Sequence, residues 1–177
     1  MLDENSKLWW DEITGPSSLI LEIVTQLQSA KSIILYVQED LPWRKQMRSS
    51  VEGMLNNNDP DLLISYVDCK RDCADIRSVP EFILKTFALP EVRNGYRVSS
   101  GIPIHKYIMD SKALENRIIW VKGMNRQQVS DWYNFCKSYQ ARTRYNGLFV
   151  IESYEELTSD SVASHIRQLR IALRPRR

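Results

Sequence analysis

The stretch SSLILEIVTQLQSAKSIILYV, residues 17–37, decides the fold class of this chain. Its first part carries apolar residues three and four positions apart, which predicts an amphipathic helix that begins at Ser17 or Ser18. Its last part, residues 32–37, is a continuous apolar run, typical of a strand buried on both faces of a parallel sheet. A helix followed directly by such a strand is the repeating unit of an α/β protein.

The same alternation continues along the chain. Further strands are predicted near residue 13 and at residues 62–67, 117–122 and 148–153. Further helices are predicted at about residues 43–57, 80–87, 104–110, 124–142 and 159–173. Within the helix at 124–142, one aromatic face is formed by Val129, Trp132, Tyr133, Cys136 and Tyr139. We therefore predict a single three-layer α/β domain spanning residues 1–177, with a mainly parallel sheet of about five strands and helices on both faces. An irregular excursion occupies about 68–117, and a basic C-terminal helix lies within about 159–177.

Length and composition limit the classes of protein. A chain of 177 residues fits one domain, and 43% hydrophobic with 26% charged residues is typical of a soluble globular protein. The start, MLDENSKLWW, is acidic and polar where an export signal is basic and then apolar, and no apolar run is long enough to span a membrane. We expect a cytoplasmic protein with no membrane contact. Three cysteines, an odd number, fit reduced thiols better than a disulfide framework.

Few residues are candidates for metal or nucleophilic chemistry. Asp68 and Glu152 are the acids at strand ends, and either could hold a metal, although such acids are common in any α/β fold. Cys69 and Cys73 form a C-x₃-C pair that lacks the second closely spaced ligand pair of a structural zinc site. We therefore predict no metal, no cofactor and buried or half-buried thiols.

Ile13, Thr14, Gly15 and Pro16, followed by Ser17, Ser18 and Leu19, match both sides of a phosphate-binding loop. The layout resembles the STAND class of P-loop NTPases, and more closely its inactive members from bacterial conflict and antiviral systems. The runs at 120–123 and 147–152 are also similar to such members, and the resemblance covers about residues 9–152. A working loop needs Gly-x-x-x-x-Gly-Lys-Ser/Thr. Here Gly15, Pro16, Ser17 and Ser18 join directly, so the resemblance implies a degenerate Walker A loop.

Loss of catalysis is also expected from physical chemistry. Phosphoryl transfer depends on loop amides, the loop lysine, Mg²⁺ and an acidic ligand. The loop lysine is absent, and the strand at 117–122 ends in Lys122 where an acid is needed. We expect a pseudo-enzyme with no small-molecule substrate, and the resemblance implies an interaction or adaptor module in a prokaryotic defence or signalling complex.

Such a module needs a protein partner. Leu41 and Trp43 place a large apolar surface at a helix start beside the carboxyl ends of the strands, where α/β folds carry their sites. Aromatic residues of this kind are favoured as interface anchors. We predict the partner surface around Leu41, Trp43 and the following excursion.

Two alternative functions remain open from sequence. The first is a nucleic-acid-binding accessory protein, which would use the arginines of the C-terminal helix: Arg167, Arg170, Arg174, Arg176 and Arg177. A net charge of only +2 and the absence of a recognised motif argue against sequence-specific reading. The second is a magnesium-dependent NTPase or nuclease that uses Asp68 and Glu152.

Overall fold

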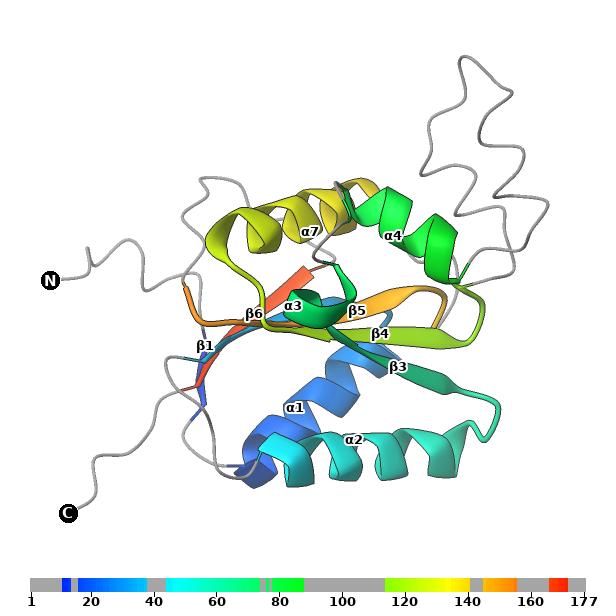
Figure 1. Ribbon diagram of the computed structural model, residues 1–177. Coiled ribbons are helices and arrows are strands. Elements are labelled where there is room, and N and C mark those ends of the chain that lie inside the picture. The colour runs from blue at the N-terminus through cyan, green and yellow to red at the C-terminus, as the bar shows by residue number, and fades with distance from the viewer. Residues whose placement is uncertain are drawn as a thin grey trace, which may run out of the picture.

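One parallel sheet organises the molecule (Figure 1). The computed structural model describes residues 11–13, 16–37, 44–73, 76, 78–87, 114–140, 145–155 and 166–171. The strands are β1 (Asp11–Ile13), β2 (Ser32–Val37), β3 (Leu63–Asp68), β4 (Arg117–Lys122), β5 (Leu148–Ser153) and β6 (Ile166–Ile171). Their order in the sheet is β1-β6-β2-β5-β4-β3, and every neighbouring pair is parallel.

Helices cover both faces of this sheet (Figure 1). Helices α1 (Pro16–Gln28) and α2 (Arg44–Asn58) lie on one face, while α4 (Val79–Thr86) and α7 (Arg126–Ser138) lie on the other. The one-turn helix α3 (Cys69–Asp72) follows β3 directly. The predicted α/β architecture, with a parallel sheet between helical layers, is confirmed. The sheet has six strands in place of about five.

The central strands are mostly apolar because both of their faces are covered. In β5 every residue is buried, and in β2 the buried part runs from Ser32 to Leu35. These two strands pair directly, with Ile33 opposite Val150 and Leu35 opposite Glu152. Successive side chains point to opposite faces. The continuous runs of the sequence therefore supply two separate cores.

The first core lies between the sheet and the α1–α2 layer. Its helical residues recur at the spacing that the sequence predicts: Leu19, Ile23 and Leu27 in α1, and Met47, Val51 and Leu55 in α2. All six are at most 1% exposed. Burial of one such side chain stabilises the fold by about 1.5–3 kcal/mol. This face is therefore held by ordinary amphipathic packing.

The second core is aromatic. The predicted face of α7 is buried as a whole, and Phe135 joins it. The ring centroid of Phe149 in β5 lies 5.5 Å from that of Trp132 and 5.6 Å from that of Phe135. The ring of Phe82 in α4 lies 6.0 Å from Trp132. Edge-to-face contacts at these distances are favourable, so rings join α7 to β5 and α4 to α7.

The predicted C-terminal helix is wrong over residues 166–171, which form β6. This strand fills the place between β1 and β2, with Arg167 opposite Ile33 and Arg170 opposite Glu12. Ile166 and Leu169 are three residues apart, a spacing that is typical of a helix face and predicts a helix here. Both residues are nevertheless buried in the strand. Backbone pairing to strands on both sides overrides a short periodic pattern.

The excursion is only partly described. Its first predicted helix, at about 80–87, is confirmed as α4, which begins at Val79 after the N-cap Ser78. The second predicted helix, at about 104–110, lies outside the described residues.

Candidate functional site

β2 is the strand at which the sheet divides into two halves that the chain builds at different stages. The chain leaves β2 through α2 toward β3, β4 and β5 on one side, while β6 and β1 lie on the other side. In open parallel α/β sheets, ligands bind outside the carboxyl ends of the strands at such a point. The carboxyl ends of β2 and β5, together with the first turn of α2, therefore define the candidate site, at the left of Figure 1.

A buried ion pair occupies this position. Glu152 in β5 is 1% exposed, and its Oε1 lies 2.8 Å from Nε of Arg44, the first residue of α2. Its Oε2 lies 3.8 Å from Nη2 of Arg48, one helical turn further on. A buried carboxylate without a cation is costly. The two arginines therefore compensate Glu152, which in turn offsets part of the positive charge at the start of α2.

Tyr154 holds the other side of Arg44. The Nη1 of Arg44 donates a hydrogen bond of 3.1 Å to the Tyr154 hydroxyl, and the guanidinium Cζ lies 5.6 Å from the centroid of its ring. Cation–π contacts at this range are attractive. Arg44 thus lies between a carboxylate and an aromatic ring, and both contacts hold its guanidinium in place.

Asp68 at the end of β3 has a structural role. Its carboxylate accepts a hydrogen bond from the backbone N–H of Lys70 at 3.1 Å, which caps α3. Nζ of Lys122 lies 3.8 Å from the same carboxylate. Gly123 beside it has a φ of +73°, and a Cβ there would lie 2.9 Å from Asp68 Oδ1. The turn after β4 therefore needs glycine, because a side chain would displace the cap.

The two acids at strand ends are not brought together. Asp68 and Glu152 belong to β3 and β5, and β4 lies between these strands. Their backbones are therefore about 10 Å apart, at roughly 4.8 Å per strand. Among the residues described, no group of three or more His, Cys, Asp or Glu side chains could hold a metal ion.

A polar hollow of about 210 Å³ opens beside the ion pair. Its walls are Arg48, Tyr66, Val67, Asp68, Arg71, Trp120 and Lys122. Its cations already have acidic neighbours, since Arg71 is paired with Asp72 at 2.8 Å and Lys122 lies near Asp68. Typical ligand pockets occupy roughly 300–1,000 Å³. The hollow suits a single polar side chain better than a nucleoside triphosphate.

The described part of the predicted loop follows the edge strand of the sheet. Ser17 and Ser18 are exposed in the first turn of α1, which follows the edge strand β1. Pro16 begins that helix, and Gly15 lies outside the described residues. The predicted partner residues Leu41 and Trp43 also lie outside them, immediately before Arg44 in sequence.

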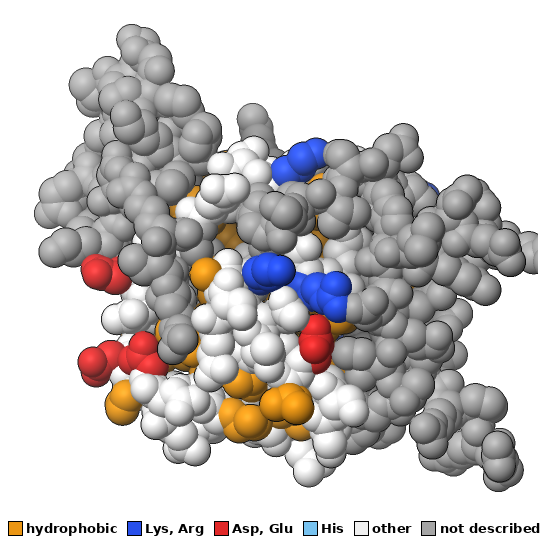
Figure 2. Space-filling model, turned by 180° about the vertical axis from the view of Figure 1, so that it is seen from behind, with side chains coloured by type: hydrophobic (Ala, Val, Ile, Leu, Met, Phe, Trp, Pro, Cys, Tyr) orange, Lys and Arg blue, Asp and Glu red, His pale blue; other side chains and the backbone are white. Residues whose placement is uncertain are grey.

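The predicted basic face on a C-terminal helix does not form over 166–171. Arg167 pairs with Glu22 of α1, with 3.4 Å between Nε and Oε1. Arg170 belongs to β6, while Arg174, Arg176 and Arg177 lie outside the described residues. Figure 2 shows basic and acidic side chains side by side on the described part of the rear face. Arg167 therefore serves an intramolecular ion pair.

Sequence reasoning missed the two arginines of the site. Arg44 and Arg48 stand four residues apart at the start of the helix that follows β2, so they share one helix face. Glu152 interrupts an otherwise apolar run that is buried throughout. An acid in such a run predicts a buried cation partner, and the start of α2 offers two candidates.

A comparison with protein-family models, with curated proteins and with solved structures finds no match to this chain. None of the helices in the described part is long and apolar enough to cross a membrane.

Proposed function

We propose that this protein is a non-catalytic, P-loop-like interaction module that holds a protein partner in a prokaryotic defence or signalling complex. In this proposal nucleotide binding has been lost. The observation that carries it is the buried contact between Arg44 and Glu152, because it occupies the crevice where a parallel α/β sheet usually receives its ligand.

The carboxylate in this contact weakens the attraction of the α2 start for phosphate. A helix start attracts phosphate through its free backbone N–H groups and the positive end of its dipole. Here the carboxylate of Glu152 lies against the first turn of α2 and compensates Arg44. A triphosphate would have to displace that carboxylate or face its charge at close range. The crevice therefore favours an internal contact over a nucleotide.

The sequence between β2 and α2 supports the same proposal. In this sheet order, a loop at the switch point would follow β2, whereas residues 15–18 follow the edge strand β1. The connection reads QEDLPW, with two acids and no glycine. A phosphate loop needs glycines so that its backbone can approach the phosphates. Neither connection therefore has the sequence of a working loop.

We expect ATP or GTP with Mg²⁺ to leave the melting temperature unchanged. A ligand at one hundred times its dissociation constant stabilises the native state by about 2.7 kcal/mol. In a domain of this size, each kcal/mol of stabilisation raises the melting temperature by roughly 2–4 °C. Differential scanning fluorimetry measures this shift. A reproducible rise at millimolar nucleotide that disappears in Gly15→Val or Ser17→Ala would show a working nucleotide site and overturn the proposal.

The partner surface is tested at Trp43. We expect Trp43→Ala to leave the melting temperature within a few degrees of the parent, and to weaken partner capture by about 2 kcal/mol, the size of a hot-spot truncation. The measurement is the affinity for the partner recovered from native extract. Leu63→Ala is the matched control, because Leu63 is 54% exposed but stands at the opposite, amino end of β3.

Two results would contradict a partner surface at Trp43. Unchanged capture together with a stability loss of about 3–5 kcal/mol, as for a buried tryptophan, would assign Trp43 to the core. Equal weakening by Leu63→Ala would place the contact elsewhere on the molecule.

A further inference from the structure

Cys69 and Cys73 form a close dithiol at the end of β3. Cys69 begins the single turn α3 and Cys73 follows that turn, with the Cys73 backbone N–H bonded to the Cys69 carbonyl at 3.1 Å. Their side chains are hydrogen-bonded to each other, and both cysteines are free. Two residues four apart on a helical turn have Cα atoms about 6.2 Å apart, and disulfides span about 4.4–6.8 Å. The Cα separation therefore falls within the disulfide range, but Cβ atoms one helical turn apart lie about 5–6 Å from each other, against about 3.5–4.5 Å in a disulfide. Closing the bridge therefore needs a local shift of the single turn α3.

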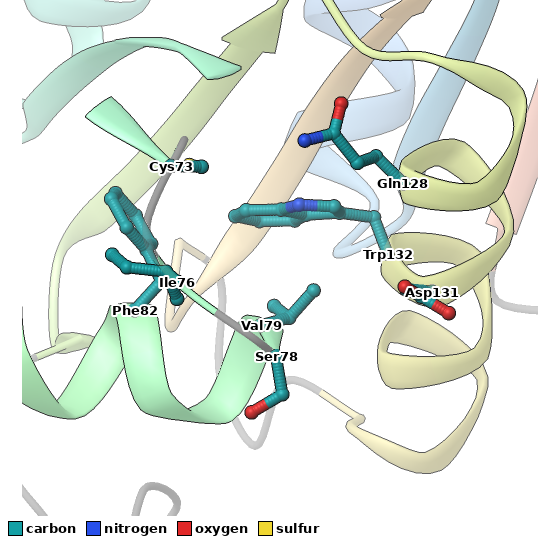
Figure 3. A pocket seen from close by; sticks show the side chains of 8 residues that line it. All are labelled: Cys73, Ile76, Ser78, Val79, Phe82, Gln128, Asp131 and Trp132. Atoms are coloured by element: carbon teal, nitrogen blue, oxygen red, sulfur yellow. The ribbon is translucent and has the colours of Figure 1, made fainter. Parts of the chain in front are cut away.

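The two thiols differ in access. Cys69 is 0% exposed, while Cys73 is 7% exposed and lines a small hollow between α3, α4 and α7. Figure 3 shows this hollow, with the ring of Trp132 extending from α7 across it and Cys73 on its wall. The cavity volume is about 30 Å³, and one water molecule needs roughly 10–15 Å³ of such volume. The hollow beside Cys73 therefore has room for a reagent close to water in size.

The hydrogen bond between the thiols also gives them different reactivity. The Cys69 thiol lowers the pKa of Cys73 by hydrogen bonding to it, although burial and the charges of Asp72 and Asp68 oppose this. The same bond, together with burial, raises the pKa of Cys69. The thiolate is the reactive form of cysteine. Cys73, which lines the hollow, is therefore the attacking sulfur, and the fully buried Cys69 lies beside it as the second sulfur.

We propose that Cys69 and Cys73 form a peroxide-reactive modification site, in which hydrogen peroxide converts the dithiol into an intramolecular disulfide. The proposal is independent of the partner function, since it rests on α3 and its surroundings alone. Hydrogen peroxide is close to water in size, and the hollow excludes bulky oxidants such as glutathione disulfide.

The reaction balances in two steps. The Cys73 thiolate attacks one peroxide oxygen, the O–O bond breaks, and the released hydroxide takes a proton to leave water and a Cys73 sulfenic acid. The Cys69 sulfur, losing its proton, then attacks the Cys73 sulfur. The S–O bond breaks, the S–S bond forms, and the hydroxide leaves with that proton as a second water. In total the dithiol gives up two protons and two electrons, and these reduce one hydrogen peroxide to two water molecules.

The test is intact mass and peptide mapping of the full chain after treatment with hydrogen peroxide. We expect the loss of two hydrogen atoms, a peptide pair bridged through Cys69 and Cys73, and full reversal by dithiothreitol. We expect Cys69→Ser to stop at a sulfenic acid that dimedone traps, and Cys73→Ser to lose the bridge. Cys136→Ser is the matched control and should keep it. Cys136 is the third buried cysteine, and burial raises its pKa.

Three results would overturn the proposal: an unchanged mass at peroxide concentrations that oxidise a free peptide thiol, a bridge that includes Cys136, or oxidation by glutathione disulfide at the same rate as by peroxide. Peptide mapping of the parent chain needs no substitution. The test therefore stands even if a serine variant does not fold.

Discussion

Glu152→Ala is expected to lower the free energy of unfolding by about 3–5 kcal/mol, the cost of breaking a buried ion pair by removal of one partner. Glu152 is 1% exposed and Arg44 only 11% exposed, so neither charge is well solvated. Without the carboxylate, the guanidinium of Arg44 keeps Tyr154 as a neighbour but loses its counter-charge. Urea unfolding followed by circular dichroism measures the loss, as a lower midpoint at unchanged slope.

Two control variants separate the charge effect from packing. Glu155→Ala removes an exposed carboxylate three residues away and should change stability by no more than about 0.5 kcal/mol. The double variant Arg44→Met with Glu152→Leu removes the Arg44–Glu152 pair while keeping volume. It leaves Arg48, which is 19% exposed, without this carboxylate, so it should regain only part of the stability that Glu152→Ala loses. A loss in Glu152→Ala no larger than that in Glu155→Ala would contradict the buried pair.

The outcome also bears on the proposed function. A charge pair that can be replaced by apolar residues without loss of stability is not required by the fold. If the double variant is stable but binds its partner poorly, the crevice is part of the partner surface. If it instead gains nucleotide-dependent stabilisation, Glu152 is what excludes phosphates from the start of α2.

The sheet could be predicted from sequence where a strand is apolar by itself. The runs at 32–37, 117–122 and 148–153 each hold at least four consecutive apolar residues, since strands covered on both faces bury most of their positions. β6 could not be predicted in this way. Its sequence IRQLRI is short and carries two arginines, and what makes it a strand is its pairing with β1 and β2 on both sides.

The candidate site depends on contacts that sequence patterns do not carry. Arg44 and Tyr154 are 110 residues apart, and they meet because β2 and β5 are neighbours in the sheet. The position of a ligand crevice follows from strand order, which local periodicity leaves open. Residues 15–18 resemble the flanks of a phosphate loop in sequence, but β1, the strand that they follow, lies at the edge of the sheet.

Phe149→Ala is expected to lower the free energy of unfolding by about 3–5 kcal/mol, the range for removal of a buried aromatic ring. Phe149 is 0% exposed, and its ring contacts those of Trp132, Phe135 and Tyr139 at centroid distances of 5.5, 5.6 and 6.1 Å. The substitution therefore opens a cavity at the point where α7 packs on β5. Urea unfolding measures the loss, again as a shift of the midpoint at constant slope.

Phe149→Leu distinguishes ring contacts from volume. Leucine keeps much of the apolar volume but loses three aromatic pairs, each worth about 0.5–1.5 kcal/mol beyond burial, so its loss should fall clearly below that of alanine while remaining measurable. Leu21→Ala, at a position in α1 that is 60% exposed, is the matched control and should stay within about 0.5 kcal/mol of the parent. Equal losses for Phe149→Ala and Phe149→Leu would show that ring geometry, and not filled space, fixes α7. A loss in Phe149→Ala as small as that in Leu21→Ala would show that α7 is not held through β5, and the aromatic core would then have to be assigned to the contact between α4 and α7.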